Sequence, residues 1–137
     1  MFAAMNAATS HPSVRINEIA FTGYPVTDLA RARDFYEKVL GLTPATTFEH
    51  EGKGWIEYDI GASTLAITNT STEQWKPSPD GPCVAFEVAD FDSALQALRA
   101  AGVRLYVEPL EFPGCRFAVV GDPDGNSVAI HQRRAQG

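Results

Sequence analysis

The sequence predicts an α+β fold in which two βαβββ modules form a curved, eight-stranded, cup-like sheet with the helices on its outer face. Three observations lead to this prediction. Two segments, 29–40 and 91–101, have apolar residues at helical spacing, and each begins after an aspartate and ends at a glycine. One strand-like segment precedes each helix and three follow it. The two halves also align at offsets of 61 to 63 residues, as an internal repeat should.

The first module is predicted to run from about residue 14 to 70. A strand at 16–24 leads to the helix, for which Asp28 is a good N-cap and Gly41 a good terminating residue. Strands are expected near 43–49, 55–60 and 64–69, with glycines in the turns between them. Residues 1–13 are interpreted as a flexible N-terminal extension of a single domain covering 14–137.

A polar, proline-bearing segment at 71–82 is predicted to be a linker. The second module, about 83–134, then repeats the order of the first. A strand at 83–88 precedes a helix capped by Asp90 and ended by Gly102, and strands follow near 105–110, 116–120 and 127–132. The turn Asp122–Asn126 (Asp-Pro-Asp-Gly-Asn) introduces the last strand, and its residues are typical of tight turns.

Alternation along the strands predicts which side chains face the helices and which line the cup. The helix-facing row is apolar and consists of Ile56, Tyr58, Ile60, Leu65, Ile67, Val84, Phe86, Val88, Phe117, Val119, Val128 and Ile130. The opposite row is smaller and more polar, and it consists of Phe21, Trp55, Glu57, Thr64, Ala66, Thr68, Cys83, Ala85, Glu87, Arg116, Ala118, Ser127, Ala129 and His131. A concave surface of this kind is the default site for a small ligand.

Bulk composition excludes several classes of function. The chain has 137 residues and a formal net charge of −6, and its basic residues form no extended cluster, so nucleic acid is not expected as a partner. No apolar run is long enough to span a membrane. The two cysteines, Cys83 and Cys115, form no disulfide framework, which favours a cytoplasmic setting.

Three motifs resemble the vicinal oxygen chelate superfamily, which includes glyoxalase I, bleomycin resistance proteins and extradiol dioxygenases. They are the segment 26–42 (VTDLARARDFYEKVLGL), the strand 84–88 (VAFEV) and the turn 122–126 (DPDGN). The resemblance covers roughly residues 14–133 and implies paired βαβββ modules. It also implies a homodimer, in which modules often pair across subunits.

The resemblance further implies a divalent metal in the cup, bound by residues of the first and last strand of each module. The family's first-strand histidine lies seven residues before the helix-capping aspartate, where this chain has Phe21 and Cys83. The family's oxygen ligand lies three residues after the asparagine of the turn, where this chain has Ala129, with Ala66 as its counterpart in the first module. Phenylalanine and alanine have no donor atom, so we expect no metal and no other cofactor at these positions.

Other cup residues leave alternatives open. Glu57, Glu87 and His131 could form a displaced metal site or act in acid–base chemistry, or they could be solvated rim residues. Cys83 is either a nucleophile or a small hydrophobic residue. Arg116 could bind a ligand anion or pair with Glu57 or Glu87. Five aromatic residues could stack on a planar ligand, namely Trp55, Phe21, Phe48, Phe112 and Trp75, and of these Trp55 and Phe21 fall on the cup row.

The favoured function is metal-free binding of a small molecule, a drug or a metabolite, by a homodimeric protein that is not an enzyme. The predicted ligand-binding residues are Phe21, Trp55, Glu57, Ala66, Cys83, Glu87, Arg116, Ala129 and His131. The alternative is a lyase, isomerase or dioxygenase that uses a displaced divalent metal, or His131 with Glu57 or Glu87. A third reading is an interaction module whose cup is filled by side chains.

Overall fold

The computed structural model describes residues 14–134 and contains two four-stranded sheets with the same topology. The first sheet has the order β1-β4-β3-β2 and the second β5-β8-β7-β6. In each sheet the first strand runs parallel to the fourth, and the remaining pairs are antiparallel. The twin βαβββ modules and the α+β class are therefore confirmed. The predicted extension at 1–13 lies outside the described residues.

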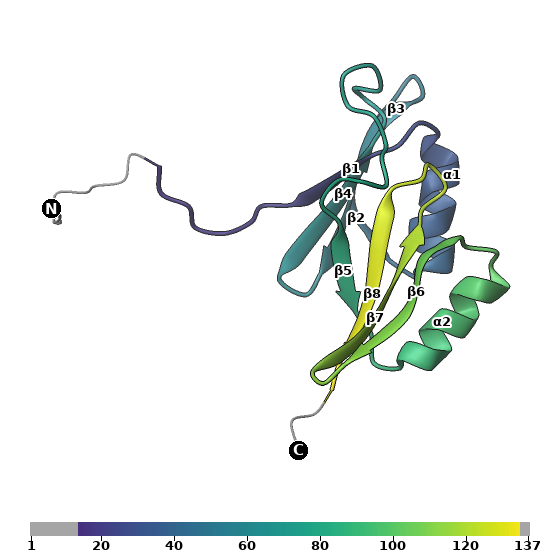
Figure 1. Cartoon of the computed structure of the whole chain (residues 1–137). Helices are drawn as coiled ribbons and strands as arrows, with labels where there is room; N and C mark the ends of the chain where they lie inside the picture. Colours follow the sequence, from purple (N-terminus) through teal and green to yellow (C-terminus); the bar gives the residue numbers. More distant parts are fainter. Residues whose placement is uncertain (1–13, 135–137) are drawn as a thin grey trace, which may run out of the picture.

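The first module contains β1 (Thr22–Pro25), α1 (Leu29–Arg33), the π-helical segment η1 (Asp34–Val39), β2 (Pro44–His50), β3 (Lys53–Ile60) and β4 (Ser63–Thr68). The second contains β5 (Val84–Glu87), α2 (Phe91–Ala100), β6 (Leu105–Phe112), β7 (Cys115–Gly121) and β8 (Ser127–Arg133). Figure 1 shows both helices on one side of the two sheets.

Both predicted helix caps are present. The side chain of Asp28 accepts the Arg31 N–H and that of Asp90 accepts the Ser93 N–H, each at 3.0 Å. Gly41 and Gly102 follow the helices with φ of 77° and 75°, in the left-handed region that glycine adopts without strain.

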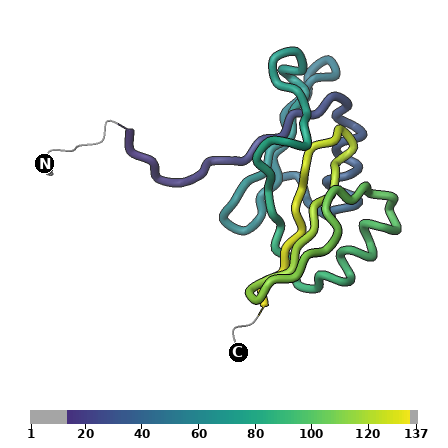
Figure 2. Tube along the Cα trace, viewed as in Figure 1, coloured from purple at the N-terminus to yellow at the C-terminus, as the bar shows by residue number. Residues whose placement is uncertain are grey.

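The first predicted strand is shorter than expected. Thr22 pairs with Leu65 of β4, and β4 itself begins only at Ser63. In this register Ala20 would lie opposite Ser63, so residues before Ala20 run past the end of their partner strand, and 15–21 form no strand. Figures 1 and 2 show this segment extending away from the body of the molecule.

The two modules share one hydrophobic core on the helix side of the sheets. Most of the predicted helix-facing row lies in this core or packs against it. The buried residues of the core are Tyr24, Val26, Leu29, Ala32, Phe35, Tyr36, Ile56, Tyr58, Leu65, Ile67, Phe91, Leu98, Ala118, Val120, Val128 and Ile130.

The predicted orientation of β7 was wrong by one residue. Ala118 and Val120 pair with Ile130 and Val128 and are fully buried in the core, whereas Phe117 and Val119 pair with His131 and Ala129 on the cup side. Directly opposed residues point to the same face of a sheet, so the register fixes the orientation. The error arose because β7 is apolar on both faces, and alternation then cannot distinguish the two phases.

Hydrogen bonds also join the modules. The Tyr24 hydroxyl donates to the Ser127 carbonyl and accepts the Val84 N–H, both at 2.7 Å. The Tyr36 hydroxyl donates to Asp122 Oδ2 at 2.8 Å, and the Asn126 amide donates to the Pro25 carbonyl at 2.8 Å. The turn before β8 is thus fixed to the first module rather than left as a free loop.

Candidate functional site

The four positions where the family resemblance implies metal ligands occupy equivalent places in the two modules. Phe21 and Cys83 immediately precede β1 and β5, while Ala66 and Ala129 lie opposite the second residues of those strands. Ala66 and Ala129 are buried, and Phe21 and Cys83 are exposed. This donor set has a single thiol and does not fit a divalent cation. Within residues 14–134 no group of three or more His, Cys, Asp or Glu side chains could hold a metal ion.

Aromatic side chains gather on the cup side of the first sheet. Phe21 contacts Trp55 edge to face, with the ring centroids 5.1 Å apart. Trp75 reaches the same surface from the linker and lies over Gly23, where an added Cβ would be only 2.9 Å from Trp75 Cη2. The sequence offers Trp75 as a possible stacking residue, but the predicted set of ligand-binding residues does not contain it. Gly23, an isolated glycine in a strand, was the signal of close approach.

Glu57 extends this surface as an acceptor. Its Oε2 accepts the indole N–H of Trp55 at 2.8 Å, and its strand position lies opposite Ala66. The hydrogen bond fixes the indole and the carboxylate relative to one another. Glu57 is therefore positioned by an aromatic neighbour of its own sheet.

Glu87 and His131 form a pair on the second sheet. They are opposed across the parallel strands β5 and β8, and His131 Nδ1 lies 2.6 Å from Glu87 Oε1. The second oxygen of Glu87 accepts the Arg133 N–H at 2.7 Å. This backbone hydrogen bond, followed by the one from His131, lowers the pKa of Glu87 below its usual value. An ionised carboxylate only accepts hydrogen bonds, so Nδ1 carries the proton and Nε2 is left to face other partners.

Arg116 lies on the other face of the sheet, so its predicted place in the cup was wrong. Arg116 is two residues before Ala118 on β7, so both side chains point to the helix side of the sheet. The guanidinium carbon of Arg116 lies 4.6 Å from the centroid of the Phe91 ring at the start of α2. It pairs with Asp92 at 3.0 Å, and Asp92 raises the pKa of Arg116. Neither Glu57 nor Glu87 is its partner.

A groove of about 520 Å³ runs along the free edge of β5, where the two sheets adjoin. Thr22 and Thr64 line it from the first module, and Cys83, Ala85 and Glu87 line it from the second. Cys83 is a free thiol, as is Cys115. Cys83 and Glu87 thus line the same groove, while Trp55 and Glu57 lie on the cup side of the first sheet.

The cup side remains open in a single chain. Phe48, Leu110 and Phe112 are large apolar side chains with 68%, 42% and 46% of their surface exposed. Phe112 stacks on Phe117 with ring centroids 6.0 Å apart, which extends the apolar surface across β6 and β7. Exposed apolar area of this extent marks a binding or association surface.

The twin βαβββ modules define the fold class of this protein. Residues 15–130 match the Glyoxalase/Bleomycin resistance protein/Dioxygenase superfamily, and the chain belongs to that superfamily. A search among curated proteins finds no match.

Several solved structures share the fold. TnmS3, an antibiotic binding protein from Streptomyces sp. CB03234, is 22% identical with a TM-score of 0.71, over 88% of this chain and 99% of that one. Lactoylglutathione lyase from Agrobacterium tumefaciens is 21% identical with a TM-score of 0.67, over 86% and 95%. A glyoxalase/bleomycin resistance protein/dioxygenase from Nocardioides is 22% identical with a TM-score of 0.66, over 91% and 89%.

Among residues 14–134, no helix is long and apolar enough to cross a membrane.

Proposed function

We propose that this protein binds a small molecule, a drug or a metabolite, on its cup-side sheet faces without a resident metal. The observation that carries the proposal is the replacement of donor atoms by Phe21, Ala66 and Ala129 at the positions where the family binds metal. Sequestering a ligand requires complementarity and no chemical step. The likeness in fold to an antibiotic binding protein supports this function.

The side chains favour a planar aromatic ligand with a positive charge. Phe21, Trp55 and Trp75 offer ring faces and edges, and the electron-rich faces of aromatic rings attract cations. Glu57 and Glu87 add carboxylates on the same side of the two sheets. A formal net charge of −6 attracts a cation at longer range.

A homodimer would complete this site. The aromatic residues lie on the first sheet and the Glu87–His131 pair on the second, and both faces are open in a single chain. A second copy that faces them would cover the exposed Phe48, Leu110 and Phe112. Light scattering coupled to size-exclusion chromatography should give twice the mass of the 14.8 kDa chain, and a monomer at all concentrations would refute the dimer.

Ligand binding is tested by a thermal-shift panel of aromatic and cationic antibiotics, with proflavine as a defined planar cation. A ligand that binds only the folded protein raises the midpoint temperature of unfolding. At a ligand concentration of a hundred times Kd, the free energy of unfolding increases by about 2.7 kcal/mol. Trp55→Ala should remove the shift, whereas Arg99→Ala, an exposed change on α2, should leave it unchanged. No shift across the panel would instead favour an interaction module.

The enzyme alternative rests on the Glu87–His131 pair. A carboxylate that holds an imidazole by Nδ1 leaves Nε2 available as a general base. The assay is isomerisation of the hemithioacetal formed from methylglyoxal and glutathione, with and without added Zn²⁺, Ni²⁺ or Mn²⁺. Turnover that His131→Ala abolishes would favour the enzyme, and stoichiometric metal in the purified protein would overturn metal-free binding.

A further inference from the structure

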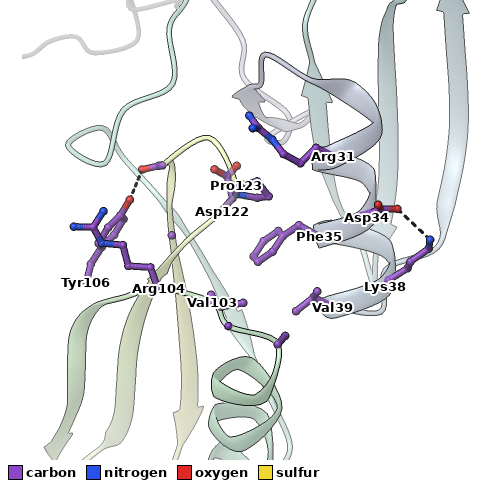
Figure 3. A pocket seen from close by; sticks show the side chains of 14 residues that line it. Arg31, Asp34, Phe35, Lys38, Val39, Val103, Arg104, Tyr106, Asp122 and Pro123 are labelled. Carbon is purple, nitrogen blue, oxygen red and sulfur yellow. Dashed lines mark hydrogen bonds and ion pairs between the residues drawn. The ribbon is translucent and has the colours of Figure 1, made fainter.

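A second hollow lies on the helix side of the sheets, where the two modules meet (Figure 3). One wall is the face of α1 and η1 that carries Arg31, Phe35 and Val39. The other wall is the connection from α2 to β6, with Val103 and Arg104, and the turn between β7 and β8. Its volume of about 590 Å³ is in the range of small-molecule pockets.

The floor of this inter-module hollow is apolar. Phe35 points into it and is 5% exposed, and Val39 and Val103 lie below Phe35 on opposite sides of the hollow (Figure 3). Phe35 and Val39 belong to the π-helical segment, where the Leu40 N–H donates to the Phe35 carbonyl, five residues back. Such wide turns are uncommon and occur frequently at functional sites.

Arg104 lies at the rim of the hollow, over the ring of Tyr106, which itself packs against Gly121. Gly121 has no Cβ, and a Cβ there would lie 2.8 Å from Tyr106 Cζ, so glycine allows the tyrosine ring to lie against the strand. The Tyr106 hydroxyl donates to the Gly125 carbonyl at 3.0 Å. The Arg104 guanidinium carbon is 5.5 Å from the centroid of this ring. The guanidinium carbon thus lies over the Tyr106 ring at the edge of the hollow.

The other two cations around the hollow have ion-pair partners. Arg31 Nη2 pairs with Asp124 Oδ1 at 2.9 Å, and Lys38 pairs with Asp34 at 3.2 Å. Asp122 is buried, and its oxygens accept hydrogen bonds within its own turn and from the Tyr36 hydroxyl. Arg104 has no carboxylate within ion-pair distance in the part of the chain that the structure describes. Arg104 is therefore the one lining cation without an ion-pair partner among the described residues, whereas the Asp122 carboxylate is buried and held by neutral donors of its own turn and of Tyr36.

We propose that this inter-module hollow binds a small organic anion, whose apolar body contacts Phe35, Val39 and Val103 and whose carboxylate pairs with Arg104. Guanidinium and carboxylate match in charge and geometry, and a pair formed beside an apolar floor is less screened than one in open solvent. The site is separate from the cup and does not depend on the function proposed for it.

The test is a titration of the full-length protein with 1-naphthoate, followed by two-dimensional ¹H–¹⁵N NMR. The amide signals of Gly102, Gly121 and Gly125 report on the hollow, and those of Gly54 and Ala129 report on the sheets. We expect saturable shifts at the first three and little change at the other two. Arg104→Gln should weaken binding about tenfold, as expected for loss of a charged hydrogen bond. Arg99→Gln, an exposed arginine on α2, should change it less than twofold.

Two further controls separate this site from alternatives. 1-Naphthalenemethanol, a neutral analogue, should bind at least about tenfold more weakly, because it cannot pair with the guanidinium. Trp55→Ala should leave naphthoate binding unchanged, even if it abolishes binding at the cup. The proposal is overturned by shifts confined to the cup, by equal affinity for the neutral analogue, by an unaffected Arg104→Gln variant, or by no shifts at millimolar naphthoate.

Discussion

Tyr36→Phe tests how the two modules are held together. Tyr36 is fully buried, and its hydroxyl donates to Asp122 Oδ2 at 2.8 Å across the module boundary. The substitution keeps the ring, which contacts Phe35 at 4.9 Å between centroids, and removes only the hydrogen bond. Hydrogen bonds to charged groups contribute about 1.5 to 3 kcal/mol. We therefore expect the free energy of unfolding at neutral pH to fall by about 2 kcal/mol.

The loss should depend on pH in a defined direction. Burial raises the pKa of Asp122 above its usual value, while hydrogen bonds from Asn126 and Tyr36 oppose that rise. A raised pKa means that the folded state binds more protons than the unfolded state, so the contribution of Asp122 to stability increases as pH falls through its folded pKa. Without the Tyr36 hydroxyl this pKa rises further. The destabilisation should thus be largest above the folded pKa and shrink below it.

Urea unfolding at several pH values between 4 and 8 measures this effect, provided that the transition is two-state. Tyr106→Phe is the matched control, because its hydroxyl donates to the neutral Gly125 carbonyl of the same turn at 3.0 Å. That variant should lose about 1 kcal/mol with no comparable pH dependence. Equal losses in the two variants, or a Tyr36→Phe loss that does not change with pH, would refute the charged hydrogen bond as the link between modules.

Three further outcomes are expected. Gly23→Ala should displace Trp75, because the new Cβ would lie 2.9 Å from Trp75 Cη2. Tryptophan emission should then shift to the red, and proflavine should bind more weakly. An unchanged emission spectrum would contradict the contact. Asp28→Ala should cost about 1 kcal/mol in urea unfolding through loss of the helix cap, and Asp28→Asn much less, whereas equal losses would argue against capping. Hydrogen bonds from the Ser93 N–H and hydroxyl lower the pKa of Asp90, so Asp90 contributes stability above its unfolded pKa, and this contribution is lost as pH falls through the folded pKa. In an NMR titration, Ser93→Ala should move the midpoint of Asp90 upward. No movement would refute the contribution of the hydroxyl.

Local signals predicted the modules well. The caps Asp28 and Asp90 and the glycines 41 and 102 bound the helices because each satisfies a backbone requirement at a helix end. The internal repeat then predicted the strands, because both modules follow the same topology. Alternation failed only where both faces of a strand are apolar, as in β7.

The site was predicted less completely, because its geometry depends on contacts between distant segments. Glu87 and His131 were correctly assigned to one side of the sheet, but their 2.6 Å contact depends on the register of two strands. Trp75 approaches from the linker, where no periodicity indicates which way a side chain points. Arg116 was misplaced together with the phase of its strand.

The proposed metal-free site is tested most directly by calorimetric titration of proflavine into protein dialysed against EDTA. We expect saturable binding that is unchanged when Zn²⁺, Ni²⁺ or Mn²⁺ is restored and that Trp55→Ala weakens. Binding that appears only after one of these metals is added, or that Trp55→Ala leaves intact, would contradict a metal-free aromatic site.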